Sequence, residues 1–78
     1  MDLQAAVAVA KQHVAELCAP GIPANVRLEN FLYDDHLAVW TLTIGFALPE
    51  AANPSANRNY KIIRVSEANK SILSVSDR

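Results

Sequence analysis

The sequence has little glycine, a single cysteine and almost no net charge, and each shortage excludes a class of function. Its two glycines, Gly21 and Gly45, cannot form the glycine-rich loop that cradles phosphate groups. One cysteine, Cys18, rules out an internal disulfide, so a reducing cytoplasm is the expected location. A formal net charge of −1 argues against a nucleic-acid partner, which requires a basic surface.

A long uninterrupted apolar run is also missing. The N-terminal stretch MDLQAAVAVAKQHVAELCAP is rich in alanine and valine, but it begins with an acidic residue and Lys11 interrupts it. It therefore fits neither a signal peptide nor a membrane span, and we expect no membrane partner. With 78 residues, 51% of them hydrophobic, the chain is expected to form one globular domain, 1–78.

Residues 3–18 have the periodicity of an amphipathic helix. Spacings of three and four place five apolar residues along one stripe: Leu3, Val7, Ala10, Val14 and Leu17. Asp2 is the expected N-cap. The helix should end before Pro20, because a residue that precedes proline avoids the helical conformation.

The rest of the chain predicts four strands. Apolar or alternating patterns cover residues 26–33, 37–48, 58–66 and 71–76. Polar residues at 34–36 and 66–70 supply turns, and the proline-containing stretch 49–57 is expected to be a loop. The expected fold is α+β: one N-terminal helix packed on a four-stranded antiparallel meander sheet, in the order α-β-β-β-β, in two layers.

The first two strands carry sharper predictions. In the first strand Val26 and Leu28 share one face, whereas Phe31 and Tyr33 share the other. A bulge or bend near Glu29–Asn30 should therefore bring both pairs inward. The second strand alternates large and small residues, and its large ones should pack under the helix. These large residues are Trp40, Leu42, Ile44, Phe46 and Leu48.

The last hairpin carries two further predictions. Asn69 is the expected left-handed turn residue, because asparagine tolerates a positive φ better than most residues. Alternation along the final strand makes Ile72 face oppositely to Leu73 and Val75. Apolar side chains should therefore lie on both faces of that strand.

Two motifs give the chain a family resemblance. One is Trp40 within VWTLTIGF, and the other is the strand–turn–strand ending YKIIRVSEANKSILSV, with Glu67 in the turn and Asn69 about where glycine is expected. Through them residues 37–76 resemble small domains of the PepSY and cystatin-like kind. The resemblance implies an accessory role, as a propeptide-like protease inhibitor or a binding module beside an enzyme. Cystatin-type inhibition is disfavoured, since the Gln-x-Val-x-Gly hairpin and the Pro-Trp pair are absent.

Side chains that could carry chemistry are scattered. Asp34, Asp35 and His36 are adjacent, but they fit a turn better than a metal site, which needs more ligands. His13 and Cys18 are too far apart on the helix for a nucleophilic pair. We therefore expect no enzymatic activity, no cofactor and no metal.

The most informative feature is strand surface that a single helix cannot cover. The face away from the helix should carry Val39, Thr41, Thr43, Tyr60, Ile62 and Arg64. Because contiguous apolar patches mark interfaces, we expect a non-catalytic module that binds a protein partner, or a second copy in a homodimer, through this face or an edge strand. The alternative is a small-ligand pocket between helix and sheet, lined by Phe31, Tyr33 and Trp40.

Overall fold

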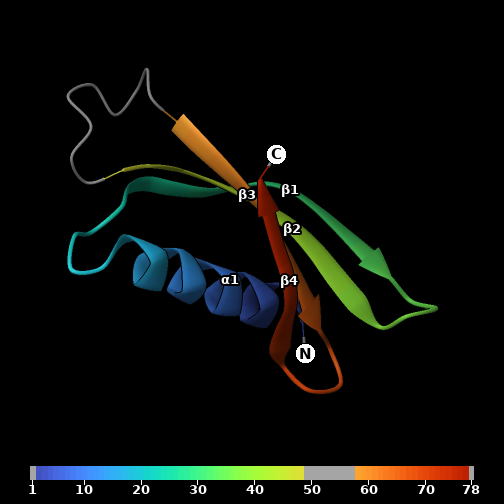
Figure 1. Ribbon diagram of the computed structural model, residues 1–78. Helices are drawn as coiled ribbons and strands as arrows, with labels where there is room; N and C mark the ends of the chain where they lie inside the picture. Colours follow the sequence, from blue (N-terminus) through green and yellow to red (C-terminus); the bar gives the residue numbers. More distant parts are fainter. Residues whose placement is uncertain (1, 49–57, 78) are drawn as a thin grey trace.

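The computed structural model describes residues 2–48 and 58–77, which form one helix and four strands. In chain order these are α1 (Leu3–Cys18), β1 (Ala24–Asp34), β2 (Val39–Ala47), β3 (Arg58–Ser66) and β4 (Ser71–Asp77). The strands form one antiparallel sheet in the order β1-β2-β3-β4, so β1 and β4 are its edges. The predicted α+β meander is confirmed (Figure 1). The predicted loop 49–57 lies outside the described residues.

Helix α1 begins and ends where its flanking residues require. Asp2 Oδ1 accepts the backbone N–H of Ala5 at 2.9 Å, which satisfies one of the donors left unpaired in the first turn and confirms the predicted N-cap. Ala19, which precedes Pro20, has extended backbone with φ −57° and ψ 142°. The helix therefore stops at Cys18, as the proline predicts.

The buried stripe of α1 differs from the predicted one. Ala6, Ala10 and Val14 are fully buried against the sheet. Leu17, predicted to join the core, is 52% exposed, so that prediction was wrong. Leu17 lies on the same side of the helix as these three residues, but in the last turn Cys18 packs against the core instead.

The sheet face under α1 carries the core. Its fully or almost fully buried strand residues are Leu42, Ile44, Phe46, Ile63 and Val65. Cross-strand pairing sets Leu42 beside Ile63 and Trp40 beside Val65, so neighbouring strands contribute to the same layer. Burying a side chain of this size contributes about 1.5–3 kcal/mol, so these few residues hold much of the stability of so small a domain. Leu48, predicted to join them, follows the end of β2 and is exposed.

A bulge in β1 sets which of its side chains face the helix. The pairing with β2 shifts between Leu28 and Asn30, so Glu29 is an extra residue and the predicted bulge is confirmed. Leu28 pairs with Ile44, and Phe31 pairs with Leu42. Leu28 and Phe31 therefore share the face that lies toward α1, although their spacing of three would separate them in a regular strand.

The β3–β4 hairpin differs from prediction in two respects. Lys70, with φ 55°, and not Asn69 has the left-handed conformation, and its N–H donates to Ser66 O at 2.8 Å to close the turn. A bulge in β4, opposite β3, lets Ile72 and Val75 both pack against the core. The prediction that they face opposite sides was wrong, because alternation does not continue across a bulge.

Candidate functional site: the edge formed by β1

The sheet face opposite α1, which we call the open face, holds the six residues predicted to form an interface. Across β2 and β3 the register pairs Thr41 with Arg64 and Thr43 with Ile62, and Tyr60 lies opposite Gly45. Val39 belongs to the same face but is only 5% exposed, so it is not available as a contact residue. Of the other five, Arg64 is exposed and the rest are half-buried. On β4 this face continues with Ser74 and Ser76, which makes it more polar than expected.

The three residues of the predicted pocket divide into a pair and an outlier. Tyr33 and Trp40 are cross-strand neighbours whose ring centroids lie 4.6 Å apart, with an interplanar angle of 44°. The Tyr33 hydroxyl donates to Glu67 Oε2, which ties the β1–β2 hairpin to the β3–β4 turn. This hydrogen bond, reinforced by burial and by the nearby acidic charge, raises the pKa of Tyr33 above its ordinary value of 10.0. Phe31 is 52% exposed on the surface.

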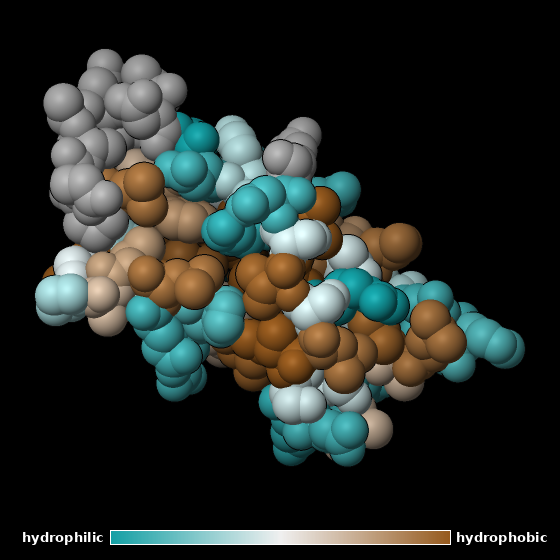
Figure 2. All heavy atoms as spheres, viewed as in Figure 1, coloured by the Kyte–Doolittle hydropathy of each residue, from teal (hydrophilic) through white to brown (hydrophobic). Residues whose placement is uncertain are grey.

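Strand β1 extends past the part of the sheet that the helix covers. Helix α1 packs mainly on β2, β3 and β4, and the β1–β2 hairpin projects beyond the start of the helix (Figure 1). In Figure 2, hydrophobic side chains continue from the middle of the molecule to this hairpin. We call residues 27–34 of β1 the β1 edge.

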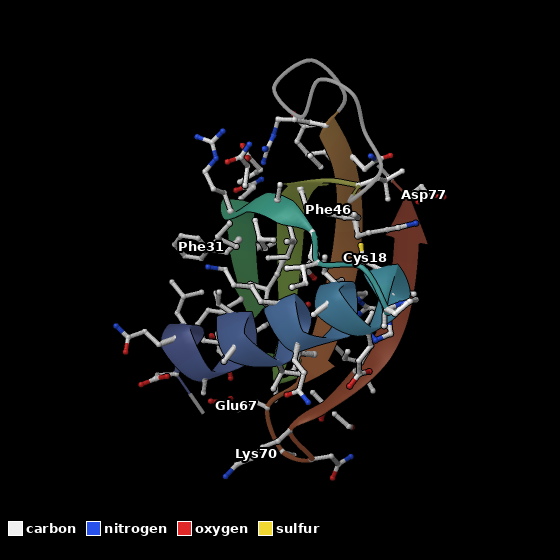
Figure 3. All side chains as sticks on the ribbon, turned by 90° about the vertical axis from the view of Figure 1, so that its left-hand side faces the viewer. Cys18, Phe31, Phe46, Glu67, Lys70 and Asp77 are labelled. Carbon is white, nitrogen blue, oxygen red and sulfur yellow. The ribbon has the colours of Figure 1, made fainter. Side chains whose placement is uncertain are left out.

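The β1 edge exposes a large apolar side chain on each face of the sheet. Phe31 faces the α1 side and lies at the outer margin of the molecule, whereas Phe46 lies between helix and sheet (Figure 3). Leu32 pairs with Thr41, faces away from α1 and is 66% exposed. Phe31 and Leu32 therefore offer apolar contact above and below the same stretch of edge.

The acidic residue in the middle of the β1 edge is turned away from it. Glu29 lies at the bulge, and its Oε1 is 3.1 Å from Nη2 of Arg58 at the start of β3, two strands away. Gly45 of β2 makes room for this ion pair, because a Cβ there would lie 2.6 Å from Arg58 Nη2 and 2.9 Å from Glu29 Oε1. The Arg58 guanidinium also lies 6.0 Å from the ring centroid of Tyr60. A charge of the kind that protects edge strands is therefore held over the open face instead.

A backbone donor on the β1 edge is held by a side chain. The N–H of Phe31 donates to Oδ1 of Asn30 at 2.8 Å, in an exposed position. A short polar side chain that bonds a neighbouring backbone group offers that group a local substitute for a ladder hydrogen bond. The carbonyl of an added strand could take over this donor.

The opposite edge, β4, has several features that protect a strand from pairing. It is only seven residues long, against eleven in β1. Three of its residues are serine, and Asp77 at its end forms an ion pair with Lys61. Shortness and polar or charged side chains both discourage edge pairing. The β1 edge, with eleven residues in its strand, is the better pairing surface.

The tip of the β1–β2 hairpin is built by one carboxylate. Asp34 Oδ1 accepts the N–H groups of His36 and Leu37, at 2.9 and 3.1 Å, so the predicted turn is confirmed. Ala38 completes it with φ 54°.

Leu32 is the site residue that the sequence predictions missed. A signal was present in the run Phe31-Leu32-Tyr33, because a strand must place the middle one of three large residues on the face opposite to the other two.

No protein-family model, curated protein or solved structure gives a significant match to this chain. The resemblance to PepSY and cystatin-like domains therefore stays a prediction. Among residues 2–48 and 58–77, no helix is long and apolar enough to cross a bilayer. Within the same ranges, no three His, Cys, Asp or Glu side chains gather where they could hold a metal ion.

Proposed function

We propose that this protein is a non-catalytic interaction module that binds an extended segment of a protein partner along the β1 edge. The observation that carries the proposal is the exposure of Phe31 and Leu32 on opposite faces of one edge strand. In β-augmentation the added backbone extends the hydrogen-bond ladder, and side chains beside it give affinity and specificity. The non-catalytic part is supported by the scattered acidic residues of the sequence.

Regular geometry in the outer half of β1 supports this mode of binding. From Asn30 to Asp34 the pairing with β2 runs without a shift. A regular strand presents its outward N–H and C=O groups at the spacing that another strand requires. Because Glu29 is held by Arg58, no acidic side chain stands between Leu28 and Tyr33 to repel an approaching strand.

The test uses a short capped peptide of alternating valine and threonine, followed by backbone amide NMR. We expect peptide-dependent shift changes in the amides of residues 27–34 and unchanged amides in β4. Leu32→Arg should abolish the changes, because it places a charge on the apolar edge. Leu73→Arg is the matched control, since Leu73 is a comparably exposed leucine on β4. Shift changes confined to β4 or to the open face would contradict the proposal.

A small-ligand site beside Trp40 is a second candidate. Its Nε1 is buried and has no hydrogen-bond partner among the described residues, which costs about 1–3 kcal/mol. A ligand acceptor that reached this N–H would recover part of that cost. A ligand-dependent change in Trp40 fluorescence would support the site, and insensitivity across a metabolite panel would contradict it.

We also infer a reducing, cytoplasmic setting for this module. The support is the single cysteine of the sequence, which excludes an internal disulfide framework. The hypothesis of protease inhibition has only the family resemblance behind it.

A further inference from the structure

We propose that the segment bound at the β1 edge is β1 of a second copy of this chain, paired antiparallel around a two-fold axis at Phe31. The inference rests on the proposed function and names its partner. With the axis perpendicular to the sheet, the contact uses the same patch on both copies, and every contact away from the axis occurs twice.

With the axis at Phe31, the bulge determines which residues pair on the far side of Glu29. Glu29 is the extra residue of the bulge and has no partner of its own, so Asn30 is the next paired residue after Arg27 and Leu28. When Phe31 lies opposite Phe31 of the second copy, the other pairs follow in order outward from the axis. They are Asn30 with Leu32, Leu28 with Tyr33, and Arg27 with Asp34.

Each of these pairs joins side chains on one face of the sheet, as antiparallel pairing requires. Arg27 and Asp34 pair with Gly45 and Val39 of β2, and both point away from α1. Leu28 and Tyr33 both point toward α1, since their partners on β2 are Ile44 and Trp40. Asn30 and Leu32 pair with Thr43 and Thr41 and share the open face. The face assignment therefore agrees along the whole β1 edge.

Charges at the two ends of the β1 edge are complementary. Arg27 is exposed and forms no ion pair within residues 2–48 and 58–77. Asp34 uses Oδ1 in the hairpin turn, which leaves its second carboxylate oxygen for another contact. In the proposed register each Arg27 lies opposite an Asp34, and like charges never meet. Opposite charges across neighbouring strands stabilise their pairing.

Phe31 fills the surface that the two helices leave uncovered. Because α1 packs mainly on β2, β3 and β4, the two β1 strands would lie between the helices on the same face of the joined sheet. The two Phe31 rings meet there, on the axis. Two aromatic rings in contact across paired strands stabilise the pairing by more than the burial of their surface alone contributes.

Disulfide cross-linking tests the register, in a Cys18→Ala background that removes the native thiol. Phe31→Cys should form a linked dimer on mild oxidation, since paired residues have Cα atoms about 4.5–5.5 Å apart, within disulfide range. Asn30→Cys and Leu32→Cys chains should cross-link when mixed and much less when oxidised separately. Preferential self-linking of Leu32→Cys, or no linking of Phe31→Cys, would overturn the inference.

Light scattering at rising concentration tests the dimer and its charges without cross-linking. We expect a wild-type dimer that dissociates on dilution, and Arg27→Glu should raise its Kd about tenfold or more, because two attractive pairs become repulsive. Asp34→Asn should raise Kd less, because it removes the two attractive pairs without making them repulsive. Its amide oxygen can still accept the turn hydrogen bonds. Arg64→Glu, with the same charge change two strands away on the open face, should leave Kd unchanged.

Failure of this inference can be distinguished from failure of the proposed function. A wild-type chain that stays monomeric at every concentration overturns the dimer. If the valine–threonine peptide still shifts the amides of residues 27–34, the β1 edge binds another protein's strand and the proposed function stands. If the peptide has no effect either, both proposals fail.

Discussion

Truncating Phe31 and Phe46 to alanine should separate association from folding. Both rings lie on the α1 side of the sheet, but Phe46 is 2% exposed and Phe31 is 52% exposed. Removing a buried phenylalanine costs about 3–5 kcal/mol, which is as much as the core of a domain this small supplies. Phe46→Ala should therefore be largely unfolded. Phe31→Ala loses roughly half of that burial, so about 1–2 kcal/mol, and should stay folded.

Association of the two copies should depend on Phe31 more than on Phe46. In the proposed dimer the two Phe31 rings bury the half of their surface that the monomer exposes, which contributes roughly 1 kcal/mol each. Their joint loss of about 2 kcal/mol would weaken the dimer about thirtyfold. A mutation that leaves the monomer folded would thus weaken the dimer about thirtyfold.

The assay has two parts. Urea unfolding followed by Trp40 fluorescence, at concentrations well below the dimer Kd, reports the stability of the monomer. Sedimentation at higher concentration reports association. If Phe31→Ala destabilises the dilute protein as much as Phe46→Ala does, Phe31 belongs to the core. If association is unchanged, Phe31 is not at the contact. Either result refutes the reasoning.

Three smaller predictions follow from the same structure. The hydrogen bond to Glu67 raises the pKa of Tyr33 in the folded protein. This hydrogen bond therefore contributes its full stabilisation below about pH 10, and the stabilisation is lost as pH rises through the folded pKa. Unfolding curves measured against pH should show this loss, and Tyr33→Phe should remove the pH dependence. Val14→Ala should cost about 2 kcal/mol in urea unfolding and Leu17→Ala less than about 1, since only Val14 is buried. Gly45→Ala should lower the free energy of unfolding, because Glu29 and Arg58 of the ion pair above it must both move. In a strand without such neighbours, replacing glycine by alanine ordinarily raises stability by roughly 0.5–1 kcal/mol.

Elements defined by local signals were predictable from the sequence. Helix α1 and strand β3 occupy their predicted ranges, 3–18 and 58–66. An N-cap residue, a proline and an apolar periodicity all lie within a few residues of the structure that they determine. The β1 bulge was predictable for the same reason, since a change of apolar phase appears directly in the chain.

Features that depend on contacts outside the local window were not predictable. Leu17 has the right angular position on the helix, but its burial depends on what packs over the last turn. Lys70 takes the left-handed position because the turn closes on Ser66 there, although asparagine is the better residue for that backbone. The β4 bulge that turns Ile72 and Val75 to one face has no phase signal as clear as that in β1.

The sequence predicted which side chains share the open face, but not the exposure of β1. Alternation placed Thr41, Thr43 and Ile62 on one face, and the register agrees. Phe31 was predicted to face inward, and it does lie on the α1 side, yet half of its surface is exposed because α1 packs mainly on the other three strands. How far a helix reaches across a sheet is decided by tertiary packing, which periodicity does not encode.

The central claim is that β1 pairs with β1, and isotope-filtered NMR on a mixture of labelled and unlabelled chains tests it most directly. At concentrations where the protein associates, we predict intermolecular contacts between Phe31 rings and between Leu28 and Tyr33. Intermolecular contacts that join Ile62 or Thr43 of the open face, with none from β1, would contradict the account.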